Sequence, residues 1–140
     1  MGRILAIDYG TKRVGIAVTD PQKIIASGLS TVATQEIFSF LESYVLNNEV
    51  ECIVVGEPKQ MNNLPSDSAK STNEFVRQLE NKFKNIPVKR MDERFTSKIA
   101  QHSLLQSGLK KSERQNKELV DMVSAILILQ SYLESESNKQ

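Results

Sequence analysis

Two apolar runs near the start of the chain constrain its fold most, because only a short turn separates them. Residues 3–8 and 13–20 are rich in Val, Ile and Ala, and Gly10-Thr11-Lys12 lies in the turn between them. Short runs of this composition favour β-strands, and so short a connection makes the two strands antiparallel. The sequence therefore predicts an N-terminal hairpin that is buried on at least one face.

The rest of the chain contains both helical and strand patterns. Thr34 is a candidate N-cap for a helix whose apolar residues repeat at helical spacing up to Asn47-Asn48. The other elements expected are a third strand around 24–26 or 29–32, a buried strand at 52–55, a loop at 60–68, a helix from Ser66 or Asp67 that ends before Pro87, a strand at 88–91, a helix from Thr96 or Ser97 to Gly108, and a helix at 118–133 that is apolar on almost every side.

This order of elements predicts the fold class. Three strands come first, and strands then alternate with helices, which is typical of an α/β fold with a mixed sheet. A chain of 140 residues has the usual size of one domain. We therefore expect a single domain over 1–140, in which 134–140 form a polar tail.

The composition limits which binding partners and which cellular location can be expected. The formal net charge of +1 gives no general basic field, so binding to nucleic acid would depend on local patches. The single cysteine, Cys52, lies in an apolar run, where a buried and unreactive thiol is expected. No stretch has 18 consecutive apolar residues, and the N-terminus lacks the pattern of a signal peptide. These features predict a cytoplasmic protein without a membrane partner.

Three carboxylates stand at positions where acids are unusual. Asp8 ends the first strand, Glu93 follows the last strand, and Asp121 interrupts the apolar helix at 118–133. Burying Asp121 without a partner would cost several kcal/mol, so we expect a cation beside it. If the first and last strands are neighbours in the sheet, their carboxyl ends bring Asp8 and Glu93 together, and the helix adds Asp121.

Three converging carboxylates would suit Mg²⁺ or Mn²⁺, which prefer oxygen ligands and share phosphate oxygens with a substrate. Such a site activates water for phosphodiester hydrolysis. The alternative is a separate structural partner for each acid: a lysine for Asp121, and a helix-capping role for Asp92 or Glu93. One histidine, His102, and one cysteine do not suffice for a usual zinc site, and a Ser/His/Asp triad has little support.

Three motifs resemble those of the YqgF (RuvX) family, whose members are described as Holliday junction resolvases and as pre-16S rRNA nucleases. They are Asp8-Tyr-Gly-Thr-Lys-Arg-Val-Gly15, Asp92-Glu-Arg-Phe-Thr-Ser97 and Lys117-Glu-Leu-Val-Asp-Met-Val-Ser-Ala-Ile-Leu-Ile-Leu-Gln130. Their order and spacing match over nearly the whole chain. The resemblance implies a ribonuclease H-like fold, with a five-stranded mixed sheet flanked by helices, and a nuclease that depends on Mg²⁺ or Mn²⁺.

The resemblance also implies roles for particular residues. Its catalytic and metal-binding acids fall on Asp8, Glu93 and Asp121. Residues implied or suited to bind substrate are Lys12, Arg13, Arg94 and Thr96, together with Lys110, Lys111 and Arg114 in a basic loop that could equally be only a solvated loop. Arg94 could equally pair with Asp92 or Asp121.

One segment departs from the family pattern. Members usually show Gly-Leu-Pro after the central strand and then Asp-Gly-Ser, whereas this chain has Gly56-Glu57-Pro58 and lacks the Asp-Gly-Ser. The related resolvase RuvC has an acid near that strand end. Glu57 is therefore a candidate fourth carboxylate, with a solvent-facing loop acid as the alternative.

The main functional prediction is a hydrolase that cleaves structured nucleic acid, with 5′-end processing of precursor 16S rRNA favoured over resolution of four-way DNA junctions. A junction resolvase would usually be a dimer, and we expect a monomer or a weak homodimer. Two alternatives stay open: a nucleic-acid-binding module without catalysis, and a phosphotransferase, because the Asp8–Gly15 turn is similar to the phosphate-binding hairpin of the actin and sugar-kinase fold.

Overall fold

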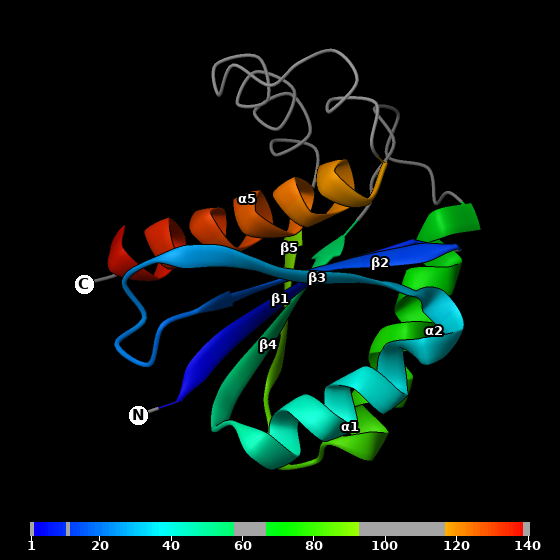
Figure 1. Cartoon of the computed structure of the whole chain (residues 1–140), viewed down its shortest axis with the longest axis horizontal. Helices are drawn as coiled ribbons and strands as arrows, with labels where there is room; N and C mark the ends of the chain where they lie inside the picture. Colours follow the sequence, from blue (N-terminus) through cyan, green and yellow to red (C-terminus); the bar gives the residue numbers. More distant parts are fainter. Residues whose placement is uncertain (1, 11, 58–66, 93–116, 139–140) are drawn as a thin grey trace.

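The computed structural model describes residues 2–10, 12–57, 67–92 and 117–138. Figure 1 shows how the elements of these residues are arranged. In chain order they are β1 (Arg3–Tyr9), β2 (Arg13–Thr19), β3 (Ala26–Ala33), a 3₁₀ turn η1 (Thr34–Glu36), α1 (Ile37–Asn47), β4 (Val50–Glu57), α2 (Asp67–Lys82), β5 (Val88–Asp92) and α5 (Lys117–Asn138).

The five strands form one mixed sheet in the order β3-β2-β1-β4-β5. β1 pairs with β2, and β2 with β3, in antiparallel fashion, whereas β4 is parallel to both β1 and β5. The predicted α/β class, the N-terminal hairpin and the five-stranded mixed sheet are therefore confirmed.

The prediction that the first and last strands are neighbours is wrong, because β4 lies between β1 and β5. The reason is burial: Ile53, Val54 and Val55 are fully buried, on both faces of the sheet. A strand that is apolar on both faces is most stable in the interior of a sheet. In β5 no residue from Val88 to Met91 is fully buried, and this strand takes the edge.

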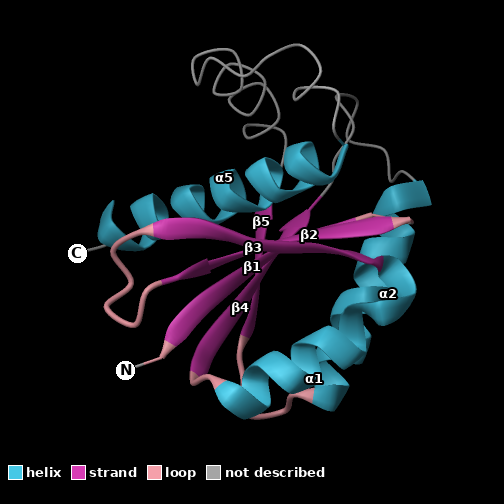
Figure 2. Cartoon of the chain, viewed as in Figure 1, coloured by secondary structure: helices cyan, strands magenta, loops and turns pink. Residues whose placement is uncertain are grey.

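Helices cover both faces of the sheet (Figure 2). α1 and α2 lie on one face and α5 lies on the other. Successive side chains of β1 point to opposite faces of the sheet, so alternate residues pack against the helices on each face. Leu5 and Ile7 belong to the core with α1 and α2, whereas Ile4 and Ala6 belong to the core with Ala125, Ile128 and Leu129 of α5.

Two local expectations need correction. Thr34 does not cap α1: it begins η1, and its hydroxyl donates to the Gly10 carbonyl oxygen at 2.7 Å. The N-cap of α1 is Glu36, without a side-chain cap. α5 does not end at Leu133 but runs to Asn138, since 134–138 contain no glycine or proline to stop it. The helix expected from Thr96 or Ser97 lies outside the described residues.

Other expectations hold. The third strand includes 29–32, and Ile24 and Ile25 stay in the preceding turn. Cys52 is buried, and burial raises the pKa of its thiol. Among the described helices, no segment combines the length and hydropathy needed to span a membrane.

The turn between β2 and β3 predicts a response to acid. The Asp20 carboxylate accepts hydrogen bonds from the backbone N–H groups of Ile25, Ile24 and Gln22, and these lower the Asp20 pKa below its ordinary value of 3.8. A lowered folded-state pKa means that the carboxylate stabilises the turn at neutral pH and loses this effect as the pH falls through the folded value.

We therefore expect the protection factors of the Ile24 and Ile25 amide protons, taken relative to the intrinsic exchange rate at each pH, to fall below about pH 4, before the core unfolds. NMR-detected hydrogen exchange between pH 2.5 and 6 measures this. Protection of both amides that stays constant down to pH 2.5 would contradict the role of Asp20.

Candidate active site

Asp8 lies near the carboxyl end of the central strand β1, where it is partly buried. It shares the strand face of Ile4 and Ala6, which pack against α5. Across the hairpin its register partner is Gly15 of β2. The fold thus places Asp8 on the α5 side of the sheet, directly beside Gly15.

Gly15 is also a point of very close contact between α5 and the sheet. A Cβ atom on Gly15 would lie 2.1 Å from the backbone carbonyl oxygen of Asp121 and 3.1 Å from the Asp121 Cβ. Only a glycine permits so close an approach of two backbones. Gly15 therefore has Asp8 on one side and Asp121 above it, which brings the two acids into one neighbourhood.

Asp121 has the cationic partner that its apolar surroundings predict. Arg13 Nε donates to Asp121 Oδ2 at 2.9 Å. The Arg13 side chain is 34% exposed and that of Asp121 is 24% exposed, so the pair is partly withdrawn from solvent. Such a pair resists screening by salt better than a fully exposed one. The alternative expectation of a lysine partner for Asp121 is wrong.

The other acids can be placed only by their backbones. Glu57 ends β4 and Asp92 ends β5, and the two are register partners. Since β1, β4 and β5 are parallel, their carboxyl ends meet at one edge of the sheet. The other predicted site residues, namely Glu93, Arg94, Thr96, Lys110, Lys111 and Arg114, lie outside the described residues.

The described residues test the fit of a divalent ion in part. Asp8 and Asp121 supply carboxylate oxygens, the ligand type that Mg²⁺ and Mn²⁺ prefer. No group of three His, Cys, Asp or Glu residues gathers within the described part of the chain. Asp8 and Asp121 have the ligand chemistry that such an ion prefers, and the third acid expected from the sequence, Glu93, lies outside the described residues.

A hollow beside the hairpin turn suits an anionic ligand. It has a volume of about 420 Å³ and is lined by Lys12, Ala33, Thr34 and Gln35. Lys12 is exposed, and its carbonyl oxygen accepts a hydrogen bond from the Thr34 N–H at 3.1 Å. With the bond from the Thr34 hydroxyl to Gly10, this fixes the turn against the start of η1. Lys12 is the charged member of this lining, so the hollow fits a phosphate better than a cation.

Comparison with known proteins identifies the family. The family model described as "RuvX: Holliday junction resolvase" matches residues 2–135. The chain belongs to the RuvX family. Two similar RuvX relatives are each named "Putative pre-16S rRNA nuclease". The one from Phocaeicola vulgatus is 56% identical over 97% of this chain and 98% of its own length, and the one from Bacteroides thetaiotaomicron is 54% identical over 97% and 99%.

Solved structures support the fold of this RuvX chain. A structure titled "T. thermophilus RuvC in complex with Holliday junction substrate" has a TM-score of 0.56 at 16% identity and covers 98% of this chain and 96% of its own. A second, titled "Thermus thermophilus RuvC structure", has a TM-score of 0.54 at 14% identity, over 97% and 96%. The ribonuclease H-like fold implied by the resemblance is thereby confirmed. The names of the family and its relatives are those of nucleases, in agreement with the main functional prediction.

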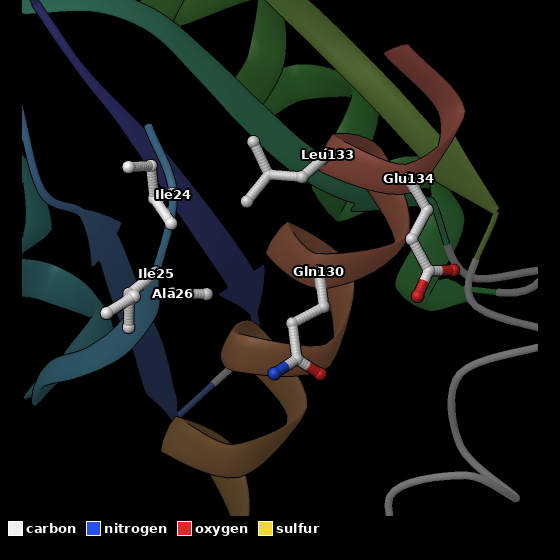
Figure 3. A pocket seen from close by; sticks show the side chains of 6 residues that line it. All are labelled: Ile24, Ile25, Ala26, Gln130, Leu133 and Glu134. Carbon is white, nitrogen blue, oxygen red and sulfur yellow. The ribbon is translucent and has the colours of Figure 1, made fainter. Parts of the chain in front are cut away.

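A second hollow, shown in Figure 3, does not suit nucleic acid. It has a volume of about 470 Å³ and is lined by Ile24, Ile25, Ala26, Gln130, Leu133 and Glu134. Leu133 points toward Ile24, and the charged member of the lining is the carboxylate of Glu134. At 1.5 Å per residue, Gln130 lies about 14 Å along α5 from Asp121. An anionic ligand would be repelled here, so the chemistry is expected at the other end of α5.

Gly15 and Thr34 shape the site of this RuvX chain but are not among the site residues that the sequence predicts. Gly15 lies inside a strand, and an interior strand glycine is itself a signal of close backbone approach. Thr34 anchors the turn from 24 residues away in the sequence. No local pattern reveals that contact, since Thr34 also satisfies the rule for a helix cap.

Proposed function

We propose that this protein is a metal-dependent nuclease that hydrolyses phosphodiester bonds in structured nucleic acid. The observation that carries the proposal is the approach of Asp8 and Asp121 to one glycine, with Arg13 bound to Asp121. Glu93, which follows Asp92 in the sequence, is proposed as the third acid, and Glu57 as a possible fourth ligand.

The proposed roles follow from the chemistry of the side chains. Asp8, Asp121 and Glu93 would hold Mg²⁺ or Mn²⁺, and the bound metal would supply an activated water and charge stabilisation for the leaving oxygen. Lys12 and Arg13 are proposed to bind and orient the phosphate at the cleaved bond. Other phosphates of the nucleic acid would be bound by Arg94, Thr96, Lys110, Lys111 and Arg114. Hydrolysis adds water across the P–O3′ bond and leaves a 5′-phosphate and a 3′-hydroxyl.

Precursor 16S rRNA is the substrate we favour, with 5′-end processing during ribosome biogenesis as the role. Its support is the name shared by relatives that are more than half identical over nearly the whole chain. A four-way DNA junction is the second candidate, and its support is the description of the matching family model. We propose that the chain acts in the cytoplasm as a single domain, as a monomer or a weak homodimer.

The direct test compares both substrates in one assay. End-labelled precursor 16S rRNA and a four-way DNA junction are incubated with the protein and Mn²⁺, and the products are resolved on denaturing gels. We expect cleavage of the rRNA precursor near its mature 5′ end and slower or no cleavage of the junction. The reverse preference would favour resolution of DNA junctions.

Removal of the metal gives a separate prediction. Excess EDTA should abolish cleavage, and added Mn²⁺ or Mg²⁺ should restore it, because the carboxylates alone supply no activated water. The binding of labelled RNA, measured by fluorescence anisotropy, should persist without metal. Cleavage that continues in EDTA would contradict metal dependence, and salt-sensitive binding without any cleavage would indicate a non-catalytic binding module.

A further inference from the structure

The bond between Arg13 and Asp121 engages one of the two oxygens of a carboxylate that is proposed as a metal ligand, and it places a positive charge beside that carboxylate. Arg13 Nε lies 2.9 Å from Asp121 Oδ2, and both side chains keep some exposure to solvent. The backbone of Asp121 is fixed against Gly15, so this acid cannot move far to find another partner. Arg13 and a divalent ion would therefore compete for one carboxylate whose backbone is held in place.

We infer that Arg13 is a positioning residue that competes with the metal ion for Asp121 and turns to a substrate phosphate once the ion is bound. The inference rests on the proposed function, because it takes Asp121 as a metal ligand. It adds an order of events: Arg13 holds Asp121 in the metal-free protein, and binding of the ion releases the guanidinium.

Electrostatics gives the reason for the exchange. A guanidinium and a divalent cation repel each other at short distance, and a metal-bound carboxylate has less negative charge left for Arg13. Arginine does not lose its proton, so it needs another anion. A phosphate accepts two parallel hydrogen bonds from a guanidinium. Arg13 directly follows Lys12, whose side chain lines the neighbouring hollow.

A purely structural role for Arg13 predicts the opposite change in metal affinity. If Arg13 only braced Asp121, its removal would loosen the carboxylate and weaken metal binding. If Arg13 competes with the ion, its removal frees Asp121 and removes a nearby positive charge, so metal binding tightens. The sign of the change therefore separates the two roles.

The first test is a calorimetric titration of the metal-free protein with Mn²⁺. The dissociation constant for Arg13→Gln should be lower than that of the wild type by roughly five- to tenfold, the lower end of the usual range for the coupling between two sites. Arg13→Lys keeps the charge and should stay within about twofold of the wild type. Asp121→Asn should lose most of the binding.

An unchanged or weaker affinity for Mn²⁺ in Arg13→Gln would overturn the inference, as would equal tightening in Arg13→Lys. Circular dichroism checks that each variant is folded. Arg13→Met keeps a long unbranched side chain without the charge, and it replaces Arg13→Gln if that variant does not fold, with the same result expected.

The second test asks whether Arg13 contacts a substrate phosphate when a divalent ion is bound. Binding of labelled precursor 16S rRNA is measured over a range of salt concentrations, with and without Ca²⁺, another divalent ion that prefers oxygen ligands. With Ca²⁺, the slope of log affinity against log salt should fall by about one in Arg13→Gln, which corresponds to one lost phosphate contact. Without Ca²⁺ the slope should not change. If the slope for Arg13→Gln equals that of the wild type with Ca²⁺ as well as without it, the proposed release of Arg13 is overturned.

Failure of the inference can be told from failure of the proposed function. Wild-type protein that binds no Mn²⁺ and cleaves neither substrate would remove the proposed function. Wild-type protein that binds Mn²⁺ through Asp121, with no gain in Arg13→Gln, would leave the nuclease in place and remove only the competition.

Discussion

Replacing Asp8 by Asn is expected to slow phosphodiester cleavage by about a thousandfold, since a metal site supplies several kcal/mol of transition-state stabilisation and each 1.36 kcal/mol is a factor of ten. Asn keeps the shape of Asp but not its charge, so the metal loses a ligand while the packing of β1 remains. The measurement is the initial rate of cleavage of labelled precursor rRNA in Mn²⁺. The midpoint of thermal unfolding should move by only a few degrees.

Asp20→Asn is the matched control, because it makes the same change at the opposite end of the strands from Asp8. The Asp20 carboxylate accepts backbone hydrogen bonds in the β2–β3 turn and has no proposed part in catalysis. We expect this variant to lose stability in the turn and to keep the wild-type rate. Equal cleavage rates for Asp8→Asn and the wild type would exclude Asp8 as a catalytic ligand.

Replacing Gly15 by Ala should affect stability and activity together. The new Cβ would lie 2.1 Å from the Asp121 carbonyl oxygen, which is backbone and cannot rotate away. Either β2 or α5 must shift, and such overpacking costs about 3 kcal/mol or more. For a domain of this size we expect the unfolding midpoint to fall by roughly 10 °C. Cleavage should fall as well, because α5 carries Asp121.

Gly28→Ala is the control for this prediction. Its new Cβ would lie 2.8 Å from Met122 Cγ on the same helix, but the obstacle is a flexible side chain that can change rotamer. We expect a much smaller loss of stability and a rate near that of the wild type. If differential scanning calorimetry gave both variants the same midpoint, the close contact between β2 and α5 would be refuted.

The sequence predicts local structure well and predicts the neighbours of each element less well. The hairpin, β4, β5 and α2 follow from apolar periodicity and from Gly and Pro at their ends. The order of strands does not follow from periodicity, and the expectation that β5 lies beside β1 is wrong for this reason. β4 has apolar residues on both faces, which indicates an interior strand, and so does β1. The pattern therefore does not tell which of the two strands lies next to β5.

At the candidate site, too, local features can be predicted from the sequence and contacts between distant residues cannot. The need of Asp121 for a cation follows from its apolar helix, but the choice of Arg13 does not, since 108 residues separate the two in the sequence. Thr34 satisfies a local rule for helix caps and instead makes a distant hydrogen bond to Gly10. Contacts between distant residues depend on tertiary packing, which overrides local preference. The roles of the acids stay predictions that the variants above test.

The long separation between Arg13 and Asp121 has a consequence during synthesis. Asp8 and Arg13 leave the ribosome early, but Asp121 follows 108 residues after Arg13. At usual elongation rates of about 5–20 residues per second, that interval is roughly 5 to 20 s. Throughout it the nascent chain lacks the helix that brings the second carboxylate to Gly15. With Asp121 as its proposed second acid, the nuclease is expected to cut RNA only after almost the whole domain has been translated.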